Sequence, residues 1–147
     1  MPGVGPRVEY ERLRHAGRRC YEQALTLYRA PFLSQEDDVP WSLPLRENLH
    51  VKLVSRILAW AGQAEENTQM ETALSLYQRG LETDDLVEDF YRGLMRSYSK
   101  REEWSAAIKV YRRCQKVLSA RMGVEPSSAT KRLYMSVLES SQTEDAK

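Results

Sequence analysis

Two histidines and two cysteines are the residues of this chain best suited to metal binding or nucleophilic chemistry. His15 and His50 belong to different predicted helices, and Cys20 and Cys114 show neither a Cys-x-x-Cys nor a Cys/His spacing. Isolated residues of these kinds are more often buried structural thiols and surface or half-buried histidines. We therefore expect no metal site and no cofactor.

The carboxylates of the chain give no stronger indication of catalysis. Adjacent acidic residues at 36–38 and 84–85 fall in predicted loops, where such groups are usually solvated or cap a helix. General acid–base catalysis requires carboxylates that converge in a cleft. The chain also has no phosphate-binding glycine loop, no Gly-x-Ser-x-Gly and no His-Glu-x-x-His. We expect no catalytic residue and no enzyme activity.

Four cations have the spacing of one polar helix face, which we call the basic face: Lys109, Arg112, Arg113 and Lys116. Such a stripe would suit nucleic-acid phosphates, although a charged helix face is more often only solvated. The chain has 22 Lys and Arg residues against 21 Asp and Glu, a net charge of +1. Nucleic-acid-binding domains usually carry a clear positive excess. Direct nucleic-acid binding by this segment is therefore not expected, and any contact would be an auxiliary one to backbone phosphate.

The elements that position these residues are helices, because apolar residues recur at steps of three and four along the chain. This spacing predicts six helices, at about 7–28, 42–62, 68–81, 85–98, 104–120 and 127–138, with Ser127 capping the last and Gly123 ending the fifth. No segment alternates as a strand would, so the predicted class is all-α. We expect one domain over residues 7–139, with disordered residues 1–6 and a frayed tail at 140–147.

A short sequence repeats with a fixed period. Residues 73–77, ALSLY, recur 34 residues later as AIKVY at 107–111, and residues 24–28 read ALTLY. This period, with small and aromatic residues at fixed offsets, is typical of the tetratricopeptide helix hairpin, which stacks in a right-handed superhelix. The predicted hairpin units are residues 48–82 and 85–120, with a capping helix at 127–139. The alternative is chance similarity between amphipathic helices.

In helix-pair repeats the first helix of each pair lines a groove that holds partners. The residues predicted to line it are Lys52, Ser55 and Arg56 from one helix and Asp89, Arg92, Arg96 and Lys100 from another. Arginines in a groove bind an acidic peptide or loop through charge-assisted hydrogen bonds. The alternative for Arg96 is an ordinary surface pair with a neighbouring glutamate.

Residues 24–134 resemble a known family over several phrases in the family's order. The phrases are ALTLYRAPFL at 24–33, WSLPLRE at 41–47, RGLETD at 79–84, YRGLM at 91–95, YRRC at 111–114 and GVEPS at 123–127. Through these phrases the chain resembles the bacterial transcriptional activator domain. That domain accompanies a winged-helix DNA-binding domain in Streptomyces antibiotic regulatory proteins and related regulators. Ala30 departs from the family's usual glycine, and 100–103 fill a turn where glycine is common.

The resemblance implies a protein–protein interaction domain of a bacterial transcriptional regulator. Its partners would be other domains of the same regulator or the transcription machinery, and a homodimer is a further alternative. The competing hypothesis is a stand-alone tetratricopeptide-type adaptor with no transcriptional role. No apolar run reaches the roughly 18–20 residues that span a bilayer, and the first residues do not resemble a signal peptide. We expect a cytoplasmic location and no membrane partner.

Overall fold

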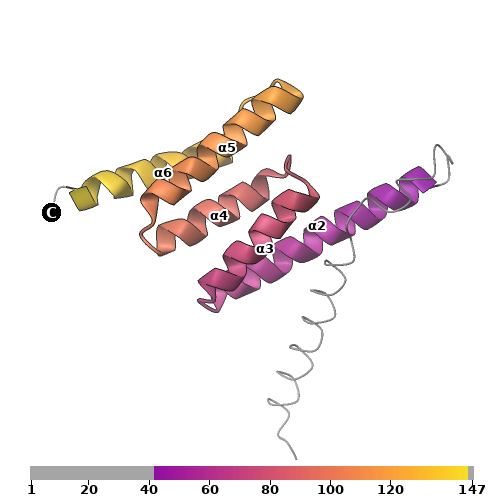
Figure 1. The fold of residues 1–147 in the computed structure, drawn as a ribbon, viewed down its shortest axis with the longest axis horizontal. Helices are drawn as coiled ribbons and strands as arrows, with labels where there is room; N and C mark the ends of the chain where they lie inside the picture. The colour runs from indigo at the N-terminus through magenta and orange to yellow at the C-terminus, as the bar shows by residue number, and fades with distance from the viewer. Residues whose placement is uncertain (1–41, 146–147) are drawn as a thin grey trace, which may run out of the picture. The chain divides into compact units, whose positions relative to one another are not determined.

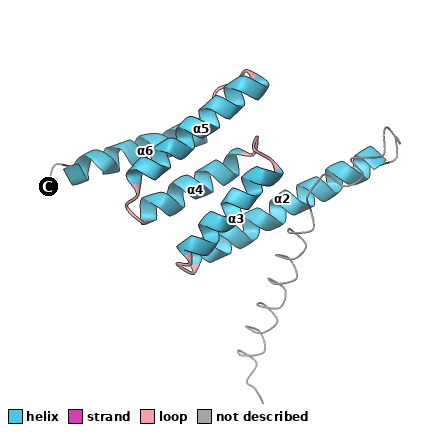
Figure 2. Ribbon diagram, in the orientation of Figure 1, coloured by secondary structure: helices cyan, strands magenta, loops and turns pink. Residues whose placement is uncertain are grey.

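The computed structural model describes residues 42–145, and within that range the chain is helical with no strand (Figures 1 and 2). The helices are α2 (Ser42–Glu66), α3 (Met70–Thr83), α4 (Glu88–Lys100), α5 (Trp104–Met122) and α6 (Ser128–Asp145). The all-α prediction is confirmed. The helix predicted at 7–28 and the N-terminus at 1–6 lie outside the described residues, so five helices stand against the six predicted. None of the described helices is long and apolar enough to cross a membrane.

The chain divides into two compact units, residues 1–50 and 51–147. Of the first unit the structure describes only 42–50, the beginning of α2, where Leu43, Leu45 and Leu49 are exposed. The second unit holds the remainder of α2 and the other four helices. The domain boundaries at 7 and 139 stay a prediction.

Local capping explains two of the helix bounds, the end of α5 and the beginning of α6. Gly123 ends α5 in the left-handed conformation, with φ 66°, and its N–H donates to the carbonyls of Leu118 and Ser119. The Ser127 hydroxyl accepts the Thr130 N–H at 3.4 Å at the beginning of α6. Both capping predictions are confirmed. Asp84 instead accepts the Leu86 N–H within the connection before α4, so this helix begins later than predicted.

Helix α6 continues to Asp145 instead of ending near 138 as the apolar pattern predicts. Its last turns are polar, yet the hydroxyls of Ser140, Ser141 and Thr143 each donate to a carbonyl in the turn before them. These hydroxyls are therefore satisfied within the helix. Polar residues end the apolar stripe without ending the helix.

Small residues bring α3 and α4 into close contact. A Cβ added at Gly80 of α3 would lie 2.3 Å from the Phe90 ring of α4, and one added at Gly93 of α4 would lie 2.3 Å from the Tyr77 ring of α3. An aromatic ring of each helix therefore packs against the backbone of the other helix at its glycine. All four residues are buried. This reciprocal contact joins the second helix of one hairpin to the first helix of the next.

The core continues from α4 into the C-terminal helices. Met95, Ala107, Tyr111 and Val137 form a buried cluster, one residue or more from each of α4, α5 and α6. The rings of Tyr111 and Tyr134 stack with their centroids 3.9 Å apart, which joins α5 to α6. Helix α4 contacts α3, α5 and α6, so it is a central helix of this unit (Figure 1).

Candidate interaction site

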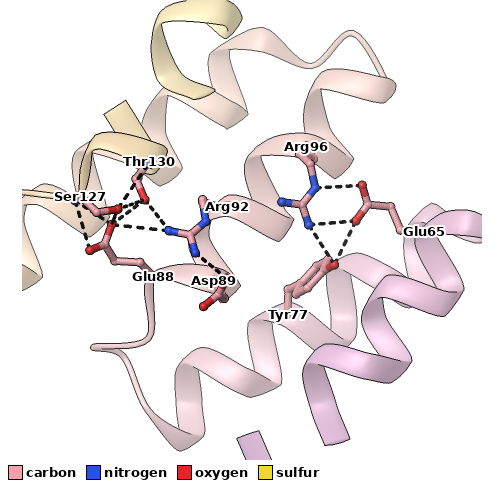
Figure 3. A network of polar contacts seen from close by, with 8 residues as sticks. All are labelled: Glu65, Tyr77, Glu88, Asp89, Arg92, Arg96, Ser127 and Thr130. Carbon is pink, nitrogen blue, oxygen red and sulfur yellow. Dashed lines mark hydrogen bonds and ion pairs between the residues drawn. The ribbon is translucent and has the colours of Figure 1, made fainter. Parts of the chain in front are cut away.

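The four predicted groove residues of α4 lie along one face, because their spacing is three or four residues. We call Asp89, Arg92, Arg96 and Lys100 the α4 row. The structure brings each member into contact with another charged or polar side chain, in two networks. Figure 3 shows both networks without Lys100. One network is centred on Glu65 and the other on Glu88.

The first network surrounds the nearly buried carboxylate of Glu65, whose side chain is only 7% exposed. Arg96 donates from Nε to Oε1 and from Nη2 to Oε2, both at 3.3 Å. Lys100 Nζ lies 3.0 Å from Oε1, and the Tyr77 hydroxyl donates to Oε2 at 3.0 Å. The network therefore ties α2 to both α3 and α4 through one carboxylate.

These donors decide the ionisation state of Glu65. Burial alone would raise the pKa of Glu65, but the hydrogen bonds from Arg96 and Lys100 outweigh it and hold the pKa below its ordinary value. The pKa of Tyr77 rises to about 12, because its hydroxyl is buried and faces the negative charge of Glu65. At neutral pH the network contains an ionised carboxylate, two cations and a neutral phenol.

The second network holds the N-terminus of α6 against α4. Glu88 accepts the Ser127 N–H at 3.0 Å, the Ser127 hydroxyl at 2.8 Å and the Thr130 hydroxyl at 2.5 Å. A carboxylate at a helix N-terminus is favoured by the helix dipole. Burial raises the pKa of Glu88, but the hydrogen bonds from Thr130 and Ser127 outweigh it and lower the pKa overall. Arg92 donates to Thr130 at 3.0 Å and pairs with Asp89.

The charges of the two networks balance. Three cations, Arg92, Arg96 and Lys100, face three carboxylates, Glu65, Glu88 and Asp89. The cationic side chains nevertheless keep part of their surface in solvent, 22% for Arg92, 43% for Arg96 and 49% for Lys100. The cations of the α4 row are thus oriented, partly exposed and neutralised by the neighbouring carboxylates.

The other predicted groove residues lie on α2. Lys52, Ser55 and Arg56 are all exposed, and none of them takes part in either network. The structure therefore brings the α4 members of the predicted groove together with Glu65 of α2, and leaves the three α2 members in solvent. A role in binding a partner stays a prediction for all seven residues.

The basic face lies on α5, and Lys109, Arg112, Arg113 and Lys116 are exposed there. Opposite them on the same helix, Ala107, Tyr111, Cys114 and Leu118 are buried. Helix α5 is thus divided into an apolar side and a cationic side, as the spacing predicts.

Cys114 and His50 are the cysteine and the histidine that lie within the described residues. No three His, Cys, Asp or Glu side chains among those residues are grouped as a metal site would require. Cys114 is a buried free thiol, and burial raises its pKa to about 12, so it is not a reactive thiolate at neutral pH. His50 lies on α2, whereas His15 and Cys20 are outside the described residues.

Sequence reasoning did not select the acceptors of either network, Glu65 and Glu88. One signal for Glu65 exists: it follows Ile57 and Ala61 at four-residue steps, so a carboxylate occupies the apolar stripe of α2 and requires a partner. Glu88 lies four residues before Arg92, an ordinary helical pair. The identity of the partners from other helices has no local signal.

Comparison with known proteins gives one match. The family model described as "Bacterial transcriptional activator domain" matches residues 7–138. No curated protein and no solved structure matches the chain.

Proposed function

The chain belongs to the bacterial transcriptional activator domain family, since the family match covers most of its length, and we propose that it acts there through protein–protein contact. The family consists of regulatory domains of transcriptional activators, and its fold is tetratricopeptide-like. The proposed partners are a DNA-binding or sensor domain of the same regulator, or the transcription machinery. Such partners would place the chain in the bacterial cytoplasm.

The observation that supports protein contact is the orientation of the α4 row. Arg96 is held by two hydrogen bonds to Glu65 and Arg92 by contacts with Asp89 and Thr130, so both guanidinium groups are ordered before a partner arrives. A pre-ordered side chain loses less conformational entropy on binding than a free one. Their exposed portions then offer donors to a carboxylate or carbonyl of a partner.

The same row would serve the competing hypothesis of a stand-alone adaptor. The family match favours the transcriptional role, because it covers 7–138 and therefore extends beyond the repeat-bearing residues alone. Contact between two copies of the chain is included in the proposal as one form of protein contact.

A tethering experiment tests the transcriptional role. The complete 147-residue chain is fused to a phage repressor DNA-binding domain, and its operator is placed upstream of a weak bacterial promoter with a reporter gene. Tethering raises the local concentration of the chain at the promoter, so contact with the transcription machinery is expected to raise reporter output severalfold. An unchanged output, with operator occupancy shown by footprinting, would contradict that contact.

Two matched variants then test the α4 row. Arg96→Ala and Glu65→Gln both remove the Arg96–Glu65 pair, but only the first removes the guanidinium that a partner would meet. We expect Arg96→Ala to lower reporter output most, and Glu65→Gln, which keeps the guanidinium but removes the carboxylate that orients it, to lower the output less. Equal loss in both variants, with equal helical circular dichroism, would assign Arg96 a structural role and count against direct contact.

A further inference from the structure

Helix α5 has cations and no carboxylates. Trp104–Met122 contains five Lys and Arg residues and no Asp or Glu: Lys109, Arg112, Arg113, Lys116 and Arg121. The first four form the basic face and are exposed. Over the seven steps from Lys109 to Lys116 a helix rises about 10 Å, so these four cations are concentrated on one short stretch of surface.

Carboxylates on neighbouring elements form ion pairs with cations outside the basic face, although Glu125 also accepts a hydrogen bond from Gln115 of α5. Asp85 pairs with Arg121, Glu103 with Arg101, and Glu125 with Lys131. Glu88 is occupied by Ser127, Thr130 and Arg92. None of the four basic-face residues forms an ion pair with any residue between 42 and 145. The near-zero net charge of the chain therefore conceals a local positive excess.

Charged side chains dominate the exposed side of α5. Tyr111 and Leu118 are buried on the opposite side, and Val110 and Val117, which border the basic face, are partly buried. Hot spots of protein interfaces are Trp, Tyr and Arg side chains in well-packed, desolvated pockets, and solvent-exposed cations contribute little affinity there. A phosphate backbone needs only exposed cations at repeated spacing. The chemistry of this surface therefore fits phosphate better than an acidic peptide.

We propose that the basic face of α5 contacts the phosphate backbone of duplex DNA, without reading its sequence. The inference rests on the proposed function in one respect only: a regulatory domain of a transcriptional activator works beside DNA. The contact is auxiliary, since four cations give weak binding that salt disrupts. It adds affinity to a regulator that is already held at its site by another domain.

The test measures binding of the complete chain to a fluorescent duplex of arbitrary sequence by anisotropy, from about 50 to 200 mM salt. Each neutralised phosphate contributes about −0.9 to the slope of log affinity against log salt, so four contacts predict a slope between −3 and −4. The double variant Arg112→Gln, Lys116→Gln is expected to bring the slope to about −2 and to weaken binding at least about tenfold at the lower salt concentration.

A matched control is available on α2. Lys52→Gln, Arg56→Gln removes two exposed cations at the same four-residue spacing and lowers the net charge by the same amount, from +1 to −1. We expect the control to change duplex affinity less than twofold. Equal loss in both double variants would mean that only net charge matters and would overturn the proposal, as would the absence of binding by the unchanged chain.

Binding of the chain to two other anionic partners is measured in the same way. A polyglutamate peptide or a phosphatidylglycerol vesicle that binds the chain more tightly than the duplex, and loses binding in the α5 variant, would assign the face to a protein or a membrane and overturn the proposal. The reporter test stays independent of this result, because the fused repressor domain supplies the DNA contact there.

Discussion

At the scale of single residues, the Glu65 carboxylate in the apolar stripe of α2 determines which side chains of the other helices must contact it. Glu65 would cost several kcal/mol if it were buried without partners. Arg96, Lys100 and Tyr77 satisfy its oxygens and keep it ionised. Glu88 has the same role at α6, where it accepts hydrogen bonds from Ser127 and Thr130. Each carboxylate connects helices that are distant in the sequence.

This arrangement predicts a stability that declines in acid. The folded pKa values of Glu65 and Glu88 lie below the ordinary value of 4.5, so the unfolded chain binds more protons as the pH falls through this region. Their contribution to the free energy of unfolding is complete above about pH 5.5. It decreases progressively as the pH falls below about 4.5 toward the folded pKa values. Urea unfolding followed by circular dichroism at several pH values between 7 and 3 measures this loss.

The variant Glu65→Gln is the control for the assignment. It is expected to lower the free energy of unfolding at neutral pH by about 1–3 kcal/mol, because Gln has no negative charge and one acceptor oxygen instead of two, so donors of Arg96, Lys100 or Tyr77 lose a partner. It should also show a smaller decrease between neutral and acid pH than the unchanged chain. An identical pH dependence in both proteins would show that Glu65 is not responsible.

At the scale of elements, α3 and α4 owe their close approach to glycine. Gly80 and Gly93 leave room for the rings of Phe90 and Tyr77. The hydroxyl of the same Tyr77 donates a hydrogen bond to Glu65. The packing of the two helices is therefore coupled to the first polar network through Tyr77. A shift of the Tyr77 ring would also remove a hydrogen-bond donor from the Glu65 carboxylate.

Gly80→Ala tests this packing. Alanine has the better helix propensity by about 1 kcal/mol, but its Cβ would lie 2.3 Å from the buried Phe90 ring. Overpacking of this kind costs about 1–3 kcal/mol, and a contact this short places it at the upper end. We expect a net loss of about 2 kcal/mol in urea unfolding.

Gly62→Ala provides the matched comparison, because Gly62 also lies within a helix but has no atom within 4 Å of an added Cβ. Here the propensity gain is unopposed, and an increase of about 0.5–1 kcal/mol is expected. If both variants were stabilised, the α3–α4 contact would be looser than the structure describes.

At the scale of the whole molecule, one side of the second unit is electrically neutral and another is cationic. The α4 row pairs its cations with carboxylates from α2 and α4, whereas α5 has no acidic residue. The two surfaces therefore suit different contacts, one with oriented hydrogen-bond donors and the other with unneutralised charge. The composition of the chain cannot reveal this difference, because the total charge is only +1.

The thiol of Cys114 reports on the integrity of this unit. It is 0% exposed, and burial raises its pKa to about 12, so a thiol reagent should reach it only when the helices separate. In a Cys20→Ser variant, labelling by a disulfide reagent near pH 8 is expected to be more than about 100-fold slower than in the denatured chain. The labelling rate should increase with urea as steeply as global unfolding does.

Rapid labelling with little dependence on urea would instead indicate local opening of α5. The unchanged far-ultraviolet spectrum of the Cys20→Ser variant is the control that the substitution itself has not altered the fold.

The sequence by itself determined the helices and much of their core. Periodicity of three and four residues fixes which side chains share a helix face, and that is a local property. The buried positions Ala73, Ala107 and Tyr111, the stop at Gly123 and the cap at Ser127 follow from it. The family phrases added the transcriptional context, and the family match confirms it.

Only the tertiary structure decided which charges meet. Arg96 and Glu65 are 31 residues apart, and Thr130 and Glu88 are 42 apart. Pairing across such distances depends on how helices pack, which no local pattern encodes. The sequence shows that α4 has Glu88 and Asp89 within one turn of Arg92 and that α5 has no acidic residue, but it does not show that Glu65 of α2 meets Arg96 and Lys100. Packing neutralised the α4 row and left the basic face of α5 without a counter-charge.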